Sequence, residues 1–250
     1  MTSQRISAVF FDLDETLIEH LWTGPEIIKG IYDAHAGVLE GIDPVAFGKT
    51  VWRKANDMWH MMYDGILPGE IARVYTFKNT LRELKLDTSA AESMGKTFES
   101  VMLESTRPSP GAADVLDALR GAGLATGIIT NGYTMMQRRK IEHHGFSGRV
   151  DHVFISEAIG AHKPDVRIFE AALSAIEAKA EDVMHVGDHF VNDVEGALDA
   201  GLQATLYDPT GERAQALEET APAIQPSHII GHLTEVLAIV GLEEASKAVD

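Results

Sequence analysis

The feature that most constrains this chain is the alternation of short apolar runs with amphipathic stretches. The runs have the length of strands: AVFF (8–11), LATGIIT (124–130), HVFIS (152–156), VMHVG (183–187), QATLYD (203–208) and, more weakly, HIIG (228–231). Strands that alternate with helical patterns favour a parallel sheet with helices on both of its faces. The sequence therefore predicts an α/β fold built on a doubly wound parallel sheet.

The alternation is interrupted between Leu17 and about Arg107, where no stretch has the pattern of a buried strand. Helical patterns fill this segment, and Asp43 before Pro44 is a suitable helix start. A connection of this length is far longer than an ordinary loop. We therefore predict an α/β core made of residues 1–18 and 107–250, with an all-helical cap, residues 19–106, inserted after the first strand.

Composition excludes several classes of function. The chain has 250 residues, no cysteine and a formal net charge of −17. The absence of cysteine excludes Cys-ligated zinc, iron–sulfur clusters and thiol nucleophiles, and it fits a reducing compartment. An acidic surface repels polyanions, so we expect no nucleic-acid polymer as a partner, although a metal can still hold a small phosphorylated substrate.

The same composition indicates a protein without a membrane partner. No stretch approaches the roughly 20 apolar residues of a membrane span, and the apolar run near the N-terminus is too short for a signal peptide. We therefore expect a cytoplasmic protein. The sequence leaves the oligomeric state open, a homodimer included.

Acidic side chains follow two of the predicted strands at their carboxyl ends, where ligands bind in open α/β sheets. Asp12 and Asp14 follow the first strand, and Asp188 follows VMHVG. Converging carboxylates repel one another unless a hard cation offsets their charge. Magnesium prefers oxygen ligands and commonly uses one or two carboxylates together with a substrate phosphate. The sequence therefore predicts a magnesium site at this edge of the sheet.

Groups suited to phosphate follow the other strands. Thr130, Asn131 and Gly132 follow LATGII of the second run, and Lys163 lies in HKPD. A phosphoryl group in transfer spreads charge over its oxygens, so its catalysis is largely positioning and electrostatic stabilisation. The ammonium group, the hydroxyl and the N–H groups near Asn131 and Gly132 can supply both. A carboxylate beside a phosphate held in this way can attack it to form an aspartyl phosphate.

The motifs D-x-D-x-T, T-N, K-P and G-D-x-x-x-N-D occur in this order. Together they resemble the motifs of the haloacid dehalogenase superfamily of phosphohydrolases, and the resemblance covers nearly the whole chain. The helical insertion is similar to the C1 cap of that family. TNGYTMMQRRKIEHHGF and DHVFISEAIGAHKPDVRIFEAAL resemble the branch with pyrimidine 5′-nucleotidases and N-acylneuraminate-9-phosphatases, although many phosphatases with a similar cap share these features.

The resemblance implies a role for each site residue. Asp12 matches the nucleophile and Asp14 the general acid and base. Asp188 matches a metal ligand, joined by Asp12 and the backbone carbonyl of Asp14. The remaining matches are the phosphate binders Thr130 and Lys163 and the metal-site support Asp193, which acts through water or through Lys163.

The function implied is a magnesium-dependent phosphomonoesterase for a small metabolite, with a nucleoside monophosphate favoured over a sugar phosphate. A 2-haloacid dehalogenase or a phosphomutase are alternatives within the superfamily, and a catalytically silent binding module is the non-enzyme alternative. A dehalogenase needs neither the metal nor the second acid, so Asp14 and Asp188 count against it. A silent module is expected to lack a key acid, and none is missing.

Other residues carry weaker expectations. His185, inside a predicted strand, is expected to be a core histidine with its hydrogen bonds satisfied. Contact of His20 and Trp22 with the leaving group, and a supporting role for His189 beside Asp188, are left open. The large apolar side chains at helical spacing in the insertion are expected to form its core; they are Trp52, Met58, Trp59, Met61 and Met62.

Overall fold

The computed structural model describes residues 5–220 and 222–242, and the chain divides into two compact units. The core unit comprises Met1–Glu19, Pro108–Asn131 and His144–Asp250. The helical unit comprises His20–Arg107 and Gly132–His143. These units differ from the predicted domains mainly in grouping Gly132–His143 with the helices.

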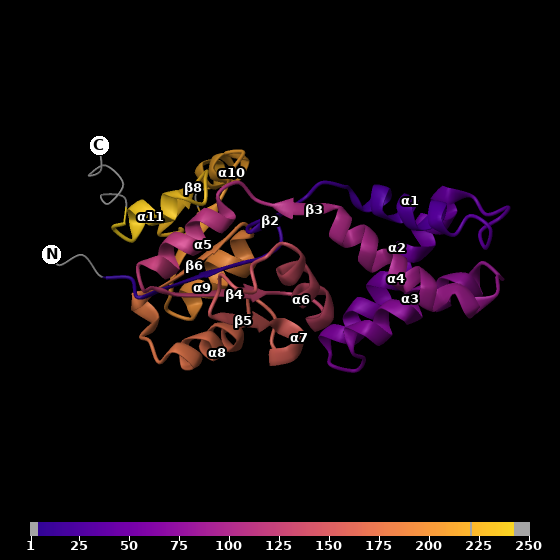
Figure 1. Ribbon diagram of the computed structural model, residues 1–250, viewed down its shortest axis with the longest axis horizontal. Coiled ribbons are helices and arrows are strands. Elements are labelled where there is room, and N and C mark those ends of the chain that lie inside the picture. The colour runs from indigo at the N-terminus through magenta and orange to yellow at the C-terminus, as the bar shows by residue number, and fades with distance from the viewer. Residues whose placement is uncertain (1–4, 221, 243–250) are drawn as a thin grey trace. The chain divides into compact units, whose positions relative to one another are not determined.

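The core unit is built on a six-stranded parallel sheet with the order β5-β4-β1-β6-β7-β8 (Figure 1). Its strands are β1 (Ala8–Phe11), β4 (Ala125–Thr130), β5 (His152–Ile155), β6 (Val183–Gly187), β7 (Gln203–Tyr207) and β8 (His228–Ile230). The chain runs outward from β1 through β4 to β5 and then returns to the other side of β1 for β6. The direction of winding therefore reverses between β1 and β6, which is where ligands bind in such sheets. The predicted α/β, Rossmann-like fold is confirmed.

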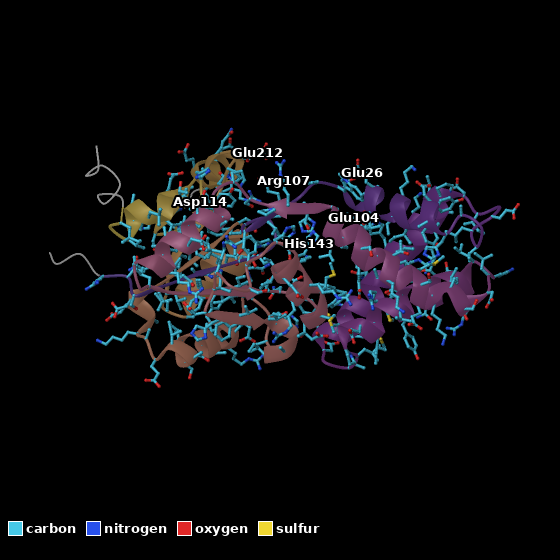
Figure 2. The ribbon with its side chains drawn as sticks, in the orientation of Figure 1. Glu26, Glu104, Arg107, Asp114, His143 and Glu212 are labelled. Carbon is cyan, nitrogen blue, oxygen red and sulfur yellow. The ribbon has the colours of Figure 1, made fainter. Side chains whose placement is uncertain are left out.

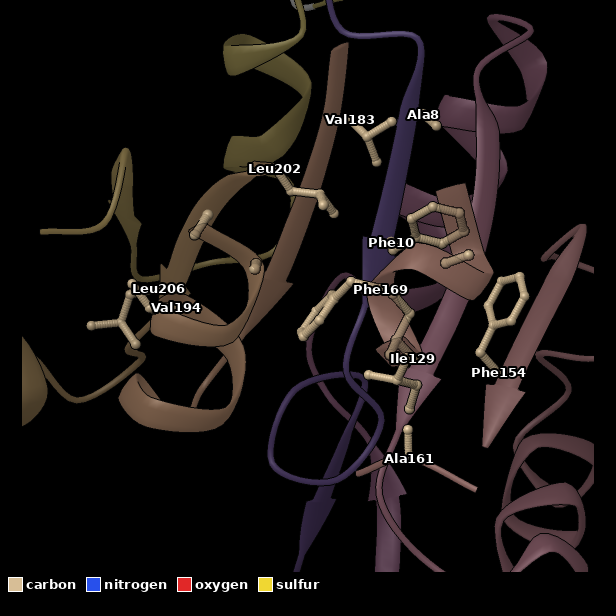
Figure 3. Close-up of a cluster of buried hydrophobic side chains, with 14 residues drawn as sticks. Ala8, Phe10, Ile129, Phe154, Ala161, Phe169, Val183, Val194, Leu202 and Leu206 are labelled. Atoms are coloured by element: carbon tan, nitrogen blue, oxygen red, sulfur yellow. The ribbon is translucent and has the colours of Figure 1, made fainter. Parts of the chain in front are cut away.

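Helices connect these strands and cover the sheet. They are α5 (Ala112–Gly121), α7 (Ser156–Ile159), α8 (Val166–Ile176), η2 (Ala180–Asp182), the π-helical turn η3 (Phe190–Glu195), α9 (Gly196–Asp199), α10 (Glu212–Thr220) and α11 (Glu235–Ile239). On one face, Phe10 and Ile129 pack with Phe169 of α8 in a fully buried cluster (Figure 3). Side chains alternate along a strand, so Val9 and Phe11 point to the opposite face. Phe10, Val9 and Phe11 are all buried, so β1 is covered on both sides, as a central parallel strand requires.

The helical unit contains α1 (Gly24–Ala34), α2 (Pro44–Tyr63), α3 (Gly69–Glu83), η1 (Thr88–Ala90), α4 (Ala91–Glu104) and α6 (Thr134–His143). As the sequence predicts, Asp43 begins a helix, and its side chain accepts a hydrogen bond from the N–H of Ala46 at 2.8 Å. The unit has its own apolar core, in which Phe47 and Phe77 are buried. Glu99 of α4 pairs with Arg73 of α3 and Arg139 of α6, which ties α6 to the other helices.

Two expectations for the insertion are wrong in part. Met58 and Met62 are buried, but Trp52 is 54% exposed and Met61 is also exposed. Successive residues of a helix are rotated by about 100°, so Trp52 lies well away from the buried direction of Val51. The insertion also contains strand residues that the sequence did not indicate. The short strands β2 (Ile18–His20) and β3 (Thr106–Pro108) pair with each other, and three residues each are too few to produce a recognisable period.

Charged groups lie at the surface in both units. Glu26, Asp114 and Glu212 are exposed acidic residues (Figure 2). Within residues 5–220 and 222–242, no helix combines the length and the apolar character that a membrane crossing requires.

Candidate functional site

The site lies where β1 and β6 end side by side. Phe11 is the register partner of Val186, and the N–H of Asp12 donates to the Val186 carbonyl at 2.8 Å. Asp12 is the first residue after β1, and Asp188 is the first residue after β6. The parallel register thus brings to one place two carboxylates that are far apart in the chain.

Asp193 of η3 completes a cluster of three acids. Carboxylate oxygens of Asp12, Asp188 and Asp193 all lie within 4.8 Å of one another, and all three residues are largely buried. Two oxygens that share a magnesium ion lie up to about 4.2 Å apart, twice the usual ligand distance, so small movements would allow the acids to surround one ion. Hard carboxylate oxygens in a buried cluster are the donor set that a divalent cation prefers. The residues present therefore fit such an ion.

The ammonium group of Lys163 lies between two of these acids. Its Nζ donates to Asp12 Oδ1 at 2.7 Å and to Asp193 Oδ1 at 2.5 Å, and its side chain is 2% exposed. Asn131 holds the backbone of this lysine from both sides: Asn131 Oδ1 accepts from the Lys163 N–H at 2.9 Å, and Asn131 Nδ2 donates to the Lys163 carbonyl at 3.0 Å. Asn131 was predicted to bind substrate through nearby N–H groups, and its side chain serves to anchor the lysine loop.

Asp193 is held by donors on both of its oxygens. Oδ1 accepts from Lys163 and lies 3.0 Å from His185 Nε2, while Oδ2 accepts from the N–H of His189 at 3.0 Å. The carboxyl group lies against Gly187, where a Cβ atom would be 2.3 Å from Asp193 Cγ. Only glycine leaves room for this arrangement, which explains why a glycine stands at position 187, directly before Asp188.

The electrostatics show a surplus of negative charge. Burial raises the pKa of Asp12 to about 8, with Lys163 opposing and the neighbouring carboxylates adding to the shift. Burial and the Asp193 carboxylate raise the pKa of Asp188 to about 6. Burial would also raise the pKa of Asp193, but Lys163 and His185 outweigh it and lower that pKa. Two cations, Lys163 and the guanidinium group of Arg213 beside Asp188, therefore face three carboxylates, and a divalent cation would offset the remaining charge.

The other predicted residues lie near the carboxyl ends of β1 and β4. Asp14 is partly buried and forms a parallel backbone bridge with Ile18, and its side chain is not in the three-acid cluster. Thr130 is buried at the end of β4, next to β1 in the sheet. Gly132 groups with the helical unit, and its φ of 144° favours glycine.

The expectation for His185 is wrong in part. Its ring is fully buried in β6, and burial lowers its pKa, so the imidazole is neutral. Because the Asp193 carboxylate can only accept, Nε2 carries the proton. Nδ1, however, is buried without a hydrogen-bond partner among the described residues. The sequence could not show this, because the partners of a strand side chain come from other elements.

Two charged residues near Asp188 were not predicted to belong to the site. Arg213 of α10 donates through an Nη atom to Asp188 Oδ2 at 2.8 Å, and its other Nη lies 3.8 Å from Asp208 Oδ1. Asp208 is the first residue after β7, so the rule that led to Asp12 and Asp188 also applies to it. Arg213 follows a turn on a weakly patterned helix, and no local signal distinguishes it from a surface arginine.

Comparison with known proteins gives consistent results. The profile of the haloacid dehalogenase-like hydrolase family matches residues 6–201. The glyceraldehyde 3-phosphate phosphatase of Pyrococcus furiosus is 29% identical over 97% of this chain and 96% of its own. The pyrimidine 5′-nucleotidase YjjG of Escherichia coli is 30% identical over 78% of this chain and 82% of its own. Among solved structures, the HAD-hydrolase YfnB from Bacillus subtilis bound to magnesium has a TM-score of 0.66 at 20% identity, covering 95% of this chain and 99% of that one.

Proposed function

Because this chain belongs to the haloacid dehalogenase-like hydrolases, we propose that it is a magnesium-dependent phosphomonoesterase that works through an aspartyl phosphate. It is an enzyme of the phosphatase type, and its substrates are small phosphorylated metabolites. The observation that carries the proposal is the convergence of Asp12, Asp188, Asp193 and Lys163 at the point where the winding of the sheet reverses.

The residues of the site can perform the reaction in two steps. A magnesium ion held by Asp12, Asp188 and the Asp14 carbonyl would offset the charge of the phosphate oxygens. Asp12 attacks phosphorus, and the bond from phosphorus to the leaving oxygen breaks as Asp14 protonates that oxygen. Asp14 then takes a proton from water, whose oxygen attacks the aspartyl phosphate to release phosphate and restore Asp12. Lys163 and Thr130 bind the phosphoryl oxygens during both steps.

Lys163 has a second role in this scheme, because it is the cation that pairs with Asp12. Burial alone would lower the pKa of Lys163, but Asp12 and Asp193 outweigh burial and raise it, so the side chain stays charged. A permanently charged donor suits the binding of a phosphoryl group. The Asn131 hydrogen bonds and Asp193 keep this donor in place.

The substrate class follows from charge and from the relatives. A net charge of −17 disfavours a nucleic-acid polymer and leaves a small phosphate ester that a metal can neutralise. The E. coli relative is named for pyrimidine nucleotides and the P. furiosus relative for glyceraldehyde 3-phosphate, so a nucleoside monophosphate and a sugar phosphate are both proposed. We place the enzyme in the cytoplasm because it has no cysteine to oxidise, and a homodimer stays a prediction.

The decisive experiment replaces the proposed nucleophile. Asp12→Asn keeps the shape of the side chain, so we expect the circular dichroism spectrum to be unchanged and the release of phosphate from an aryl phosphate to fall by about 10³-fold or more. Asp114→Asn, at an exposed position of α5, is the matched control and should keep full activity. Activity of the Asp12 variant within tenfold of wild type would remove Asp12 as nucleophile. If the wild-type protein keeps its activity in EDTA, the reaction does not require a metal ion. Separately, a panel of phosphorylated metabolites identifies the substrate.

A further inference from the structure

Arg213 engages one oxygen of Asp188, a proposed ligand of the metal. Its Nη atom lies 2.8 Å from Asp188 Oδ2, and the side chains are 38% and 12% exposed. The scheme above assigns no task to this arginine. Its contact with Asp188 comes from a different element, α10, which follows the next strand of the sheet.

Asp208 holds Arg213 in this position. The side chain of Asp208 is buried and accepts hydrogen bonds from the N–H groups of Gly211 at 3.1 Å and Ala214 at 2.8 Å. These bonds fasten the first turn of α10, which carries Arg213, to the end of β7. Asp208 Oδ1 also lies 3.8 Å from the second Nη of Arg213. The planar guanidinium group is thus fixed between two carboxylates, and little conformational entropy is lost when it holds Asp188.

The contact limits what Asp188 can offer to an ion. Oδ2 carries a charged hydrogen bond to Arg213, which makes it the poorer metal ligand, so Oδ1 is the oxygen better suited to a metal. Asp12 is limited in the same way, because its Oδ1 accepts from Lys163. Both acids, at the ends of β1 and β6, therefore favour ligation through one oxygen over ligation through two.

This restriction distinguishes between cations. Magnesium requires a nearly octahedral shell, whose neighbouring corners lie about 3 Å apart, farther than the two oxygens of one carboxylate. Calcium accepts six to eight oxygens in a flexible shell and readily takes both oxygens of a carboxylate. A site whose carboxylates each present one oxygen suits magnesium and gives calcium fewer ligands than it prefers.

We propose that Arg213 sets the metal selectivity of the site: its hydrogen bond to Asp188 Oδ2 disfavours two-oxygen ligation and so favours magnesium over calcium. The inference rests on the proposed function only for the presence of the metal site. It assigns to Arg213 a positioning role and no contact with substrate.

The test measures the affinity of the metal-free protein for each ion alone, by titration calorimetry with magnesium chloride and with calcium chloride. Removing a positive charge strengthens the binding of any divalent ion, so the informative quantity is the ratio of the two dissociation constants. In Arg213→Met we expect calcium affinity relative to magnesium to rise by about tenfold. Arg213→Ala, measured in the same way, gives an independent reading if the methionine variant folds poorly.

Arg167→Met is the matched control. Arg167 forms an exposed pair with Asp165 in the same unit, and its loss should leave the ratio unchanged. A rise of threefold or more in the Arg213 variants, absent from the control, supports the proposal. A smaller change in folded Arg213 variants overturns it while leaving the phosphatase intact. A wild-type protein that binds neither ion would instead overturn the metal site and the proposed function together.

Discussion

Replacing Lys163 with methionine would remove the ammonium group that lies between Asp12 and Asp193. Methionine has a similar length, so the main change is the loss of charge and of two hydrogen bonds, at 2.7 and 2.5 Å, in a place where the lysine side chain is 2% exposed. Breaking a buried ion pair by removing one partner costs about 3–5 kcal/mol, because the remaining charge is left without compensation. For a chain of this size that corresponds to a fall of about 6–20 °C in melting temperature.

The assay is thermal and urea unfolding, followed by circular dichroism in EDTA. Lys29→Met is the control, because Lys29 pairs with Asp33 at an exposed position and its loss should change little. Addition of magnesium should return part of the stability that Lys163→Met loses, since the ion supplies the missing positive charge. The double variant Asp12→Asn/Lys163→Met should be more stable than Lys163→Met, because it removes a buried charge together with its partner.

The pH dependence has a definite sign. Without the lysine, the buried carboxyl groups of Asp12 and Asp193 should have pKa values above those of the unfolded chain. Stability from such groups is fully present below the unfolded pKa, about 3.9, and is lost as the pH rises through the folded pKa. The deficit of Lys163→Met should therefore be small near pH 4 and large at pH 8. A variant as stable as wild type at pH 8 in EDTA, or a double variant whose loss is the sum of the two single losses, would refute this account of the cluster.

Three further predictions concern the same acids. The pKa of Asp12, about 8, means that this carboxyl group is protonated below that pH in the metal-free protein. The magnesium affinity measured by calorimetry should therefore rise from pH 6 to pH 8. A magnesium affinity that does not change with pH would contradict the electrostatics described for the cluster. Gly187→Ala places a Cβ 2.3 Å from Asp193 Cγ, so the Asp193 carboxyl group must move. This displacement should lower magnesium affinity and kcat by about tenfold or more. Wild-type kinetics in this variant would be inconsistent with the packing of Asp193 against Gly187. His185→Gln keeps a donor for Asp193 and His185→Met does not, so kcat should fall by about tenfold only in the methionine variant. Stability should not fall to match, because the methionine variant also removes the buried, unpartnered Nδ1. Equal kcat values in the two variants would show that the donor is dispensable.

Much of the fold could be predicted because its signals are local. The run at Ala8–Phe11 ends at Asp12, and the run at Val183–Gly187 ends at Asp188, as the sequence indicates. The helix start at Asp43 is also a local signal, since the capping side chain and the N–H group it binds are three residues apart. Periodicity and capping act between near neighbours, so one sequence contains the information. The strands β2 and β3 were missed because three residues do not make a period.

The assembly of the site depends on contacts between distant segments. The sequence determines which residues stand at the ends of the strands, and the motif order relates them to a family. Only the order β5-β4-β1-β6-β7-β8 brings Lys163 to Asp12, 151 residues away, and Arg213 to Asp188, 25 residues away. Such pairs form because parallel strands align their carboxyl ends when the sheet packs, and the energy of that packing is shared among many buried side chains. No short stretch of sequence encodes it, so the partner of each acid was decided by the tertiary structure.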